Sequence, residues 1–164
     1  MTHSLIPHTV AFTGHRSYKR SHDDVLLGCV EELVASGAES FRVGMAEGFD
    51  LAAALAVLSL RDSHPNLRLE LYIPYPTFSH HMSDVERRLY EAIVQRADRV
   101  EYVAEEYYTG VYQERNKRLV EGSDFVVAWW NGKPSGTSQT IGYARTLGCP
   151  VKNLYHYQQL ELEL

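Results

Sequence analysis

Glycine-bearing turns with cationic or hydroxyl side chains recur along the chain, and they hold the residues best suited to chemistry. The first turn is Thr13-Gly14-His15-Arg16, directly after an apolar segment. A glycine there lets backbone N–H groups approach a ligand without a Cβ in the way. The forked guanidinium of Arg16 suits a phosphate or carboxylate group. An ordinary turn beside a surface arginine would carry the same residues, and His15 gains a role only from its neighbours.

The second turn spans residues 44–50 and reads GMAEGFD, with Gly44 and Gly48 at a strand-to-helix junction. Unpaired N–H groups and the positive end of a helix dipole make such a junction an anion site. One helix end contributes at most about 2 kcal/mol per charge, so it does not bind an anion tightly alone. Asp50 would repel a phosphate at this point. It fits either as the cap of the following helix or as an acceptor for ribose hydroxyls.

The third element is the pair Arg115 and Asn116 on a predicted helix. Each lies three or four residues from Tyr112 and from Leu119, so both side chains belong to the helix face that meets the protein. A charged group on that face needs a partner. Asp124 is one candidate partner, and a bound anion is the other.

The fourth element is the loop 132–137, which follows the most apolar segment of the chain and leads into a helix at Ser138. Ser135, Gly136 and Thr137 offer two hydroxyl groups and a helix amino end, which suit an oxygen-rich ligand. We expect all four elements to meet, because ligands of open parallel sheets sit outside the carboxyl ends of the strands.

The sequence lacks the motifs of several other kinds of site. The phosphate-loop pattern Gly-x-x-x-x-Gly-Lys-Ser/Thr and the nucleophile pattern Gly-x-Ser-x-Gly are absent. His80 and His81 are adjacent, so they diverge on a helix or a strand, and no Cys/His spacing fits zinc. The sequence therefore predicts no metal site.

Strand-like and helix-like segments alternate along the 164 residues. That alternation predicts an α/β protein, with one Rossmann-like three-layer α/β/α domain over residues 1–164 and a mainly parallel sheet of about six strands. The predicted strands cover residues 9–13, 41–45, 67–73, 100–103, 125–130 and 151–155. The predicted helices cover about 21–37, 51–60, 83–97, 111–121 and 138–147.

Side-chain patterns assign faces to several of these elements. The alternation Leu-Arg-Leu-Glu-Leu within 67–73 predicts a strand near the sheet edge with one wet face. The helix 51–60 is apolar nearly all round, so it packs on the sheet and a neighbouring helix or lies in a subunit interface. This helix and an expected exposed pair, Trp129 and Trp130, are together compatible with a homodimer. The predicted buried stripe of the helix 83–97 is Val85, Leu89, Ile93 and Ala97.

Composition limits the partners. The chain has 16 lysines and arginines against 21 aspartates and glutamates, a formal charge of −5, and no basic run. This balance argues against a protein that coats nucleic acid. The isolated thiols of Cys29 and Cys149 are typical of reduced packing residues. No apolar run approaches a membrane span or a signal peptide, so we expect a cytoplasmic protein without a membrane partner.

The four motifs together resemble a known family. TGHR, GMAEGFDLAAA, YQERNKRLVEGSDFVVAWW and SGTSQTIGYA followed by LGCPV closely resemble the YpsA-like proteins of the SLOG superfamily, from Thr9 to about Leu154. That superfamily groups the Smf/DprA DNA-processing proteins with the Lonely Guy (LOG) phosphoribohydrolases. The resemblance implies a Rossmann-like fold and a pocket for a nucleotide or a nucleotide-derived ligand such as an ADP-ribose-like molecule. Carried over by position, the residues lining it are Gly14, His15, Arg16, Gly44, Glu47, Gly48, Asp50, Arg115, Asn116, Asp124, Ser135, Gly136, Thr137 and Thr140.

Two other functions compete with ligand binding or sensing. A LOG-like hydrolase would cut the N-glycosidic bond of a nucleotide, and Arg115 matches the arginine of that family. Thr140, however, stands where the catalytic glutamate would fall, which leaves Glu47 as the candidate acid.

A DprA-like protein would bind single-stranded DNA along a basic track interleaved with aromatic residues. The tyrosines of residues 102–112 and nearby basic side chains could form one, but acidic neighbours dilute the charge. The basic residues are Arg87, Arg88, Lys117 and Arg118, and the acidic ones are Glu101, Glu105, Glu106 and Glu114.

Overall fold

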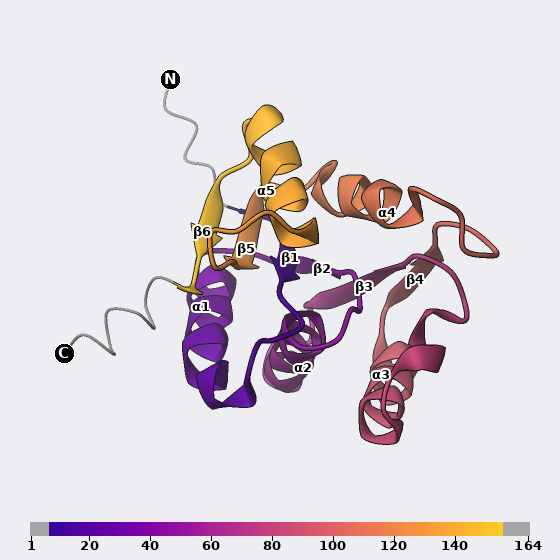
Figure 1. The fold of residues 1–164 in the computed structure, drawn as a ribbon. Coiled ribbons are helices and arrows are strands. Elements are labelled where there is room, and N and C mark those ends of the chain that lie inside the picture. The colour runs from indigo at the N-terminus through magenta and orange to yellow at the C-terminus, as the bar shows by residue number, and fades with distance from the viewer. Residues whose placement is uncertain (1–6, 156–164) are drawn as a thin grey trace.

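Six parallel strands form one sheet in the order β4-β3-β2-β1-β5-β6, in a computed structural model that describes residues 7–155 (Figure 1). Every neighbouring pair is parallel. The strands are β1 (Thr9–Gly14), β2 (Ser40–Val43), β3 (Arg68–Ile73), β4 (Arg99–Tyr102), β5 (Phe125–Trp129) and β6 (Val151–Asn153).

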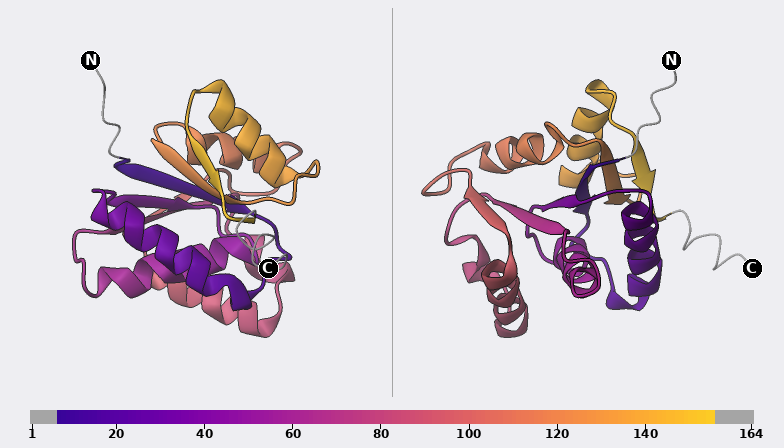
Figure 2. Two further views of the ribbon diagram at one scale, coloured as in Figure 1. Left: turned by 90° about the vertical axis from the view of Figure 1, so that its left-hand side faces the viewer. Right: turned by 180° about the vertical axis from the view of Figure 1, so that it is seen from behind.

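Helices cover both faces of the sheet, which confirms the Rossmann-like three-layer prediction. Helices α1, α2 and α3 pack on one face, and α4 and α5 pack on the other (Figures 1 and 2). The helices are α1 (Asp23–Ala35), α2 (Phe49–Arg61), α3 (Asp84–Arg96), α4 (Val111–Val120) and α5 (Gly136–Thr146), with short 3-10 turns η1 (Arg20–His22) and η2 (Phe78–His81). Within residues 7–155, no helix has the length and apolar character needed to cross a bilayer.

The strand order reverses at β1, and this reversal positions the site. The chain runs from β1 outward through β2 and β3 to β4, then returns along α4 to place β5 on the other side of β1. The connections that leave β1 and β5 therefore diverge to opposite faces of the sheet (Figure 1). Beyond the carboxyl ends of these two strands the divergence opens a crevice, the usual ligand position in such sheets.

Aromatic packing beneath the first turn explains its glycine. The Phe12 ring lies 6.0 Å from that of Phe41 and 6.3 Å from that of Phe49. A Cβ at Gly14 would lie 2.4 Å from the Phe49 ring. The residue is therefore glycine because helix α2 packs directly on the end of β1, and not because a ligand approaches the backbone there. The apolar circumference of α2 is buried between the sheet and its neighbours α1 and α3, the first of the two predicted arrangements.

The wet face predicted for β3 is wrong. Glu70 and Tyr72 on this strand are both buried, because α4 covers that face. Arg42 on the neighbouring β2 supplies the countercharge, with its Nε 3.5 Å from Glu70 Oε1 and its guanidinium 5.3 Å from the centre of the Tyr72 ring. The same arginine donates to the carbonyl oxygen of Glu121 at the carboxyl end of α4. The charge pair thus ties α4 to the sheet.

Two further side-chain predictions are corrected. Val85 is 76% exposed, and the buried residues of α3 are Tyr90 and Ile93. Trp129 is buried, and the Trp130 indole N–H donates to the carbonyl oxygen of Lys133 at 2.8 Å. The tryptophans therefore do not form an exposed pair, and the homodimer stays a prediction without them.

Gly48 is a position beside the crevice at which the fold does not accommodate a side chain. Its φ is +77°, and an added Cβ would lie 2.5 Å from the Arg16 carbonyl oxygen. We expect Gly48→Ala to lower the free energy of unfolding by about 1–3 kcal/mol or more, measured by urea denaturation. Gly142→Ala is the control, because Gly142 lies in α5 with open space around it and should gain about 0.5–1 kcal/mol from helix propensity. An equal change in the free energy of unfolding for the two substitutions would contradict a specific requirement for glycine at position 48.

Candidate functional site

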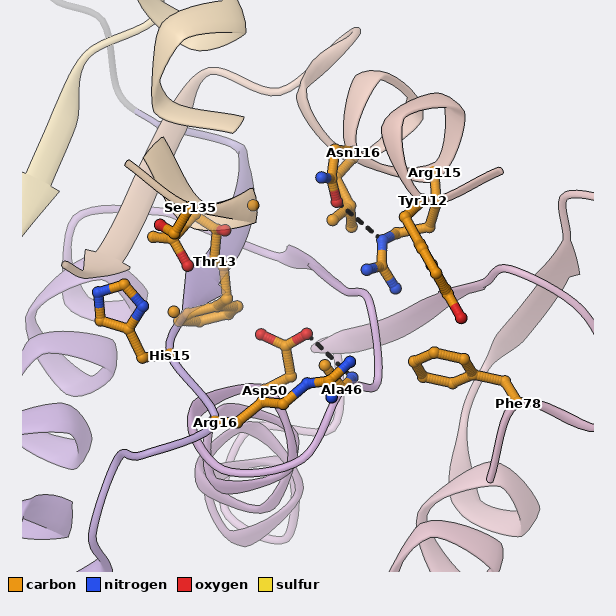
Figure 3. A pocket seen from close by; sticks show the side chains of 15 residues that line it. Thr13, His15, Arg16, Ala46, Asp50, Phe78, Tyr112, Arg115, Asn116 and Ser135 are labelled. Atoms are coloured by element: carbon orange, nitrogen blue, oxygen red, sulfur yellow. Dashed lines mark hydrogen bonds between the residues drawn. The ribbon is translucent and has the colours of Figure 1, made fainter. Parts of the chain in front are cut away.

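A pocket of about 360 Å³ opens at the carboxyl ends of β1 and β5, within the size range of small-molecule sites (Figure 3). It is lined by the end of β1 and the turn after it, the β2–α2 loop, the first turn of α2, the turn η2, one face of α4 and the start of α5. The lining residues are Phe12, Thr13, Gly14, His15, Arg16, Ala46, Asp50, Phe78, Tyr112, Arg115, Asn116, Leu119, Ser135, Gly136 and Thr137.

Asp50 lies at the centre of the pocket with half of its carboxylate unused. Its Oδ2 accepts a hydrogen bond from the Ala46 backbone N–H at 3.1 Å. Its Oδ1 is buried and has no hydrogen-bond partner among residues 7–155. The residue is 5% exposed, and burial raises the pKa of Asp50 to about 6, although the positive charges of Arg115 and Arg16 oppose this. The predicted role as helix cap is wrong, because Gly48 is the N-cap of α2 and Asp50 instead fixes the β2–α2 loop.

Arg115 is also buried in this pocket, as its place on the predicted protein-facing side of the helix indicates. Its Nη1 donates to the Gly44 carbonyl oxygen at 2.6 Å, and its Nε donates to Asn116 Oδ1 at 2.9 Å. The guanidinium lies 5.8 Å from the centre of the Phe78 ring. Burial lowers the pKa of Arg115, and the nearby charge of Asp50 opposes the shift. The two groups attract each other through space without forming an ion pair.

Asp124 does not belong to the pocket, contrary to its predicted place there. Its Oδ2 accepts hydrogen bonds from the backbone N–H groups of His8, at 3.1 Å, and Thr9, at 2.9 Å. It therefore sits at the amino-terminal end of β1, opposite the crevice. The predicted pairing of Arg115 with Asp124 is wrong for the same reason.

The amino end of α5 faces the pocket. The Ser135 side chain accepts from the Ser138 N–H and the Ser138 hydroxyl accepts from the Ser135 N–H, a reciprocal cap that starts the helix at Gly136 and not at Ser138 as predicted. This cap leaves the amides of Gly136 and Thr137 outside the hydrogen bonds of the helix. An added Cβ at Gly136 would meet nothing within 4 Å, so a ligand can approach the backbone here.

His15 ties the first turn to the β5–α5 loop. Its backbone N–H donates to the Trp129 carbonyl oxygen at 3.2 Å, and its ring Nε2 accepts from the Asn131 N–H at 3.0 Å. Burial lowers the pKa of His15, and the accepting Nε2 puts the proton of the neutral ring on Nδ1. Beside it, Arg16 is exposed, and within residues 7–155 its side chain makes no hydrogen bond or ion pair. Figure 3 shows it in front of Asp50 at the pocket mouth.

Several predicted residues lie just outside the lining. Gly44 packs against the Arg115 side chain, and Gly48 packs against the backbone of Arg16. Glu47 Oε1 lies 3.2 Å from His81 Nε2, which ties the β2–α2 loop to η2. The Thr140 hydroxyl donates to the Gly136 carbonyl oxygen within α5. These four residues support the pocket from behind, whereas the other predicted residues, apart from Asp124, line it.

Sequence reasoning missed one wall of the pocket, formed by Phe78 and Tyr112. The Tyr112 hydroxyl lies 2.9 Å from that of Tyr75, and the Phe78 ring lies 5.9 Å from the Tyr112 ring. Tyr112 was predicted to mark the protein-facing side of its helix and to belong to the tyrosines of a DNA-binding track, and not to line a pocket. The available signal was the pair Tyr75 and Phe78 directly after the carboxyl end of β3, where the crevice was expected.

The geometry defines the class of the protein. A crevice at the point where strand order reverses, with a free helix amino end and a buried cation, is the binding position of Rossmann-like α/β proteins. The chain belongs to the YpsA family, described as the YspA SLOG family, whose model matches residues 10–163. The resemblance drawn from the four motifs is thereby confirmed.

Similar sequences include one protein of Halalkalibacterium halodurans and one of Bacillus subtilis. A UPF0398 protein of Halalkalibacterium halodurans is 28% identical over 130 residues, which are 77% of this chain and 67% of the relative. The SPbeta prophage-derived protein YoqJ of Bacillus subtilis is 27% identical over 156 residues, which are 86% of this chain and 91% of the relative.

Similar structures include two DNA processing proteins A. The protein from Helicobacter pylori, described for its single-stranded DNA binding mode, matches with a TM-score of 0.65 and 19% identity over 92% of this chain and 67% of that one. The protein from Streptococcus pneumoniae (DprA) matches with a TM-score of 0.64 and 18% identity over 90% of this chain and 50% of that one. This chain thus spans half to two thirds of those proteins, and the likeness shows a shared fold.

Burying Asp50 should cost stability at neutral pH. Unfolded Asp50 loses its proton near pH 3.8 and folded Asp50 near pH 6, so the folded state loses stability as pH rises through this window. The cost is on the order of 3 kcal/mol above pH 6. We therefore expect Asp50→Asn to be more stable than the wild type at pH 7, with the difference vanishing near pH 4, in urea denaturation at both pH values.

The control for this measurement is Asp84→Asn on α3, whose side chain is exposed and pairs only with Arg87 at 2.8 Å. It should change stability by less than about 1 kcal/mol at either pH. A destabilised Asp50→Asn variant at pH 7 would mean that the attraction between Asp50 and Arg115 outweighs the burial of the carboxylate.

Proposed function

We propose that this protein binds a nucleotide or a nucleotide-derived ligand, such as an ADP-ribose-like molecule, in the pocket beyond β1 and β5. The observation that carries the proposal is Arg115, a buried arginine that forms no ion pair with any residue in 7–155. A buried charge without a paired counter-ion is costly, and an anionic ligand would complete the pair.

The rest of the lining supports an elongated ligand with an anionic end and an aromatic end. The amides of Gly136 and Thr137 at the positive end of α5 suit phosphate oxygens, and Arg115 and the exposed Arg16 add positive charge to the same pocket. The aromatic wall of Phe78 and Tyr112, beside Arg115, suits the flat face of a nucleobase. A nucleotide has both ends on one molecule.

Hydrolysis of the N-glycosidic bond has less support. Thr140 occupies the position of the LOG glutamate and bonds within its own helix, and Glu47 is engaged by His81. Among the described residues, Asp50 is the single carboxylate that lines the pocket. Binding therefore accounts for the lining without a catalytic acid from either predicted position.

Binding of single-stranded DNA is the second candidate, and the exposed tyrosines beside the pocket favour it. Tyr107 is 59% exposed, and its ring lies 5.9 Å from that of Tyr112. The other arginine of α4, Arg118, is neutralised, however, because its side chain lies 3.3 Å from Glu114 and 3.7 Å from Glu101. A polynucleotide needs a basic track along its backbone, so the small ligand is the better fit.

Calorimetry and thermal shift with AMP, ADP-ribose, NAD and cyclic AMP test the proposal. At 100 times its dissociation constant, a bound ligand should stabilise the protein by about 2.7 kcal/mol. Arg115→Met should weaken binding at least tenfold, since it removes the buried charge while filling the same space. Arg118→Met, three residues along the same helix, should bind within twofold of the wild type.

Two results would contradict this proposal. One is the absence of stabilisation by any of the four compounds, and the other is unchanged affinity in a folded Arg115→Met variant. A gel shift with a single-stranded oligonucleotide at low salt, without binding of the small molecules, would favour the DNA-binding candidate instead.

A further inference from the structure

The unused oxygen of Asp50 restricts what the ligand must offer. Oδ1 lies inside the pocket without a hydrogen-bond partner among residues 7–155, while Oδ2 is held by the Ala46 N–H. An ionised carboxylate only accepts hydrogen bonds, so its natural complement is an O–H or N–H donor. A buried acceptor left without a donor costs free energy that a ligand hydroxyl would recover.

The position of Asp50 in the pocket indicates which part of a bound nucleotide would contact it. In Figure 3 its carboxylate lies between Ser135 at the start of α5 on one side and Phe78 and Tyr112 on the other. In a nucleotide the sugar lies between the phosphate and the base. With the phosphate at α5 and the base on the aromatic wall, the ribose would lie over Asp50.

Arg16 lies beside Asp50 in Figure 3, on the side of the hydrogen bond between Oδ2 and the Ala46 N–H, and its charge acts on that carboxylate. An exposed arginine without a hydrogen bond in the described part of the chain can turn outward at little cost. The same movement would free its guanidinium for the phosphate of an incoming ligand.

We propose that Asp50 accepts a hydrogen bond from a ribose hydroxyl and makes the pocket selective for ribonucleotides over deoxyribonucleotides. This inference rests on the proposed nucleotide-binding function and adds the sugar to it. It also separates the pocket from single-stranded DNA, whose sugar lacks the 2′-hydroxyl and whose 3′-oxygen is esterified.

The test is isothermal calorimetry with AMP, 2′-deoxy-AMP and 2′,3′-dideoxy-AMP on the wild type and three variants. For the wild type, 2′-deoxy-AMP and dideoxy-AMP should both bind at least tenfold more weakly than AMP, since a hydrogen bond to a charged group is lost. In Asp50→Ala the three ligands should bind within twofold of each other. Asp50→Asn keeps an acceptor for the Ala46 N–H and should reduce the preference below threefold. Asp62→Ala, at the exposed far end of α2, should keep the wild-type preference.

The possible outcomes distinguish failure of the ribose contact from failure of nucleotide binding itself. Equal binding of AMP and 2′-deoxy-AMP by the wild type, or an undiminished preference in folded Asp50→Ala and Asp50→Asn, would overturn the inference while nucleotide binding stands. If AMP, ADP-ribose and NAD all fail to bind the wild type, the proposed function falls and the inference falls with it.

Discussion

Asp50 and Arg115 bring opposite charges into one buried pocket without pairing, and the surrounding loops hold them in that state. Each group is fixed by the backbone: the carboxylate by the Ala46 N–H and the guanidinium by the Gly44 carbonyl oxygen. Both bonds come from the same β2–α2 loop. One short segment thus sets the position of both charges, and Asp50 Oδ1 keeps capacity for a further partner. Such incomplete pairing of buried charges costs folding free energy and is typical of functional sites.

The glycines of the motifs serve this arrangement mainly through packing. Gly14 admits the Phe49 ring, Gly44 admits the Arg115 side chain, and Gly48 admits the backbone of the Arg16 turn in a left-handed conformation. Each close approach draws two loops together at the switch point between β1 and β5. By contrast, Gly136 borders open space, so the backbone that is accessible from the pocket lies at the start of α5. The motifs therefore build the walls of the pocket more than they contact its contents.

Much of this could be predicted from the sequence, because the period of the apolar residues and the switch-point rule need no long-range information. The alternating elements predict the sheet, and the burial of Arg115 and Asn116 follows from helical spacing. The misplacement of Asp124 has a physical cause: a residue just before a strand lies at the opposite end of the sheet from one just after it. Phe78 was missed because the turn η2 that places it over the pocket has no strong sequence signal. The exposure of Val85 likewise depends on how α3 lies on its neighbours.

Binding of a ribonucleotide in the pocket between α5 and the Phe78–Tyr112 wall is tested most directly by a crystal structure of the protein grown with a saturating concentration of AMP. We expect electron density for the phosphate at the amides of Gly136 and Thr137, with the ribose over Asp50. Density for AMP on another surface, or a pocket that holds only water at saturating AMP, would contradict it.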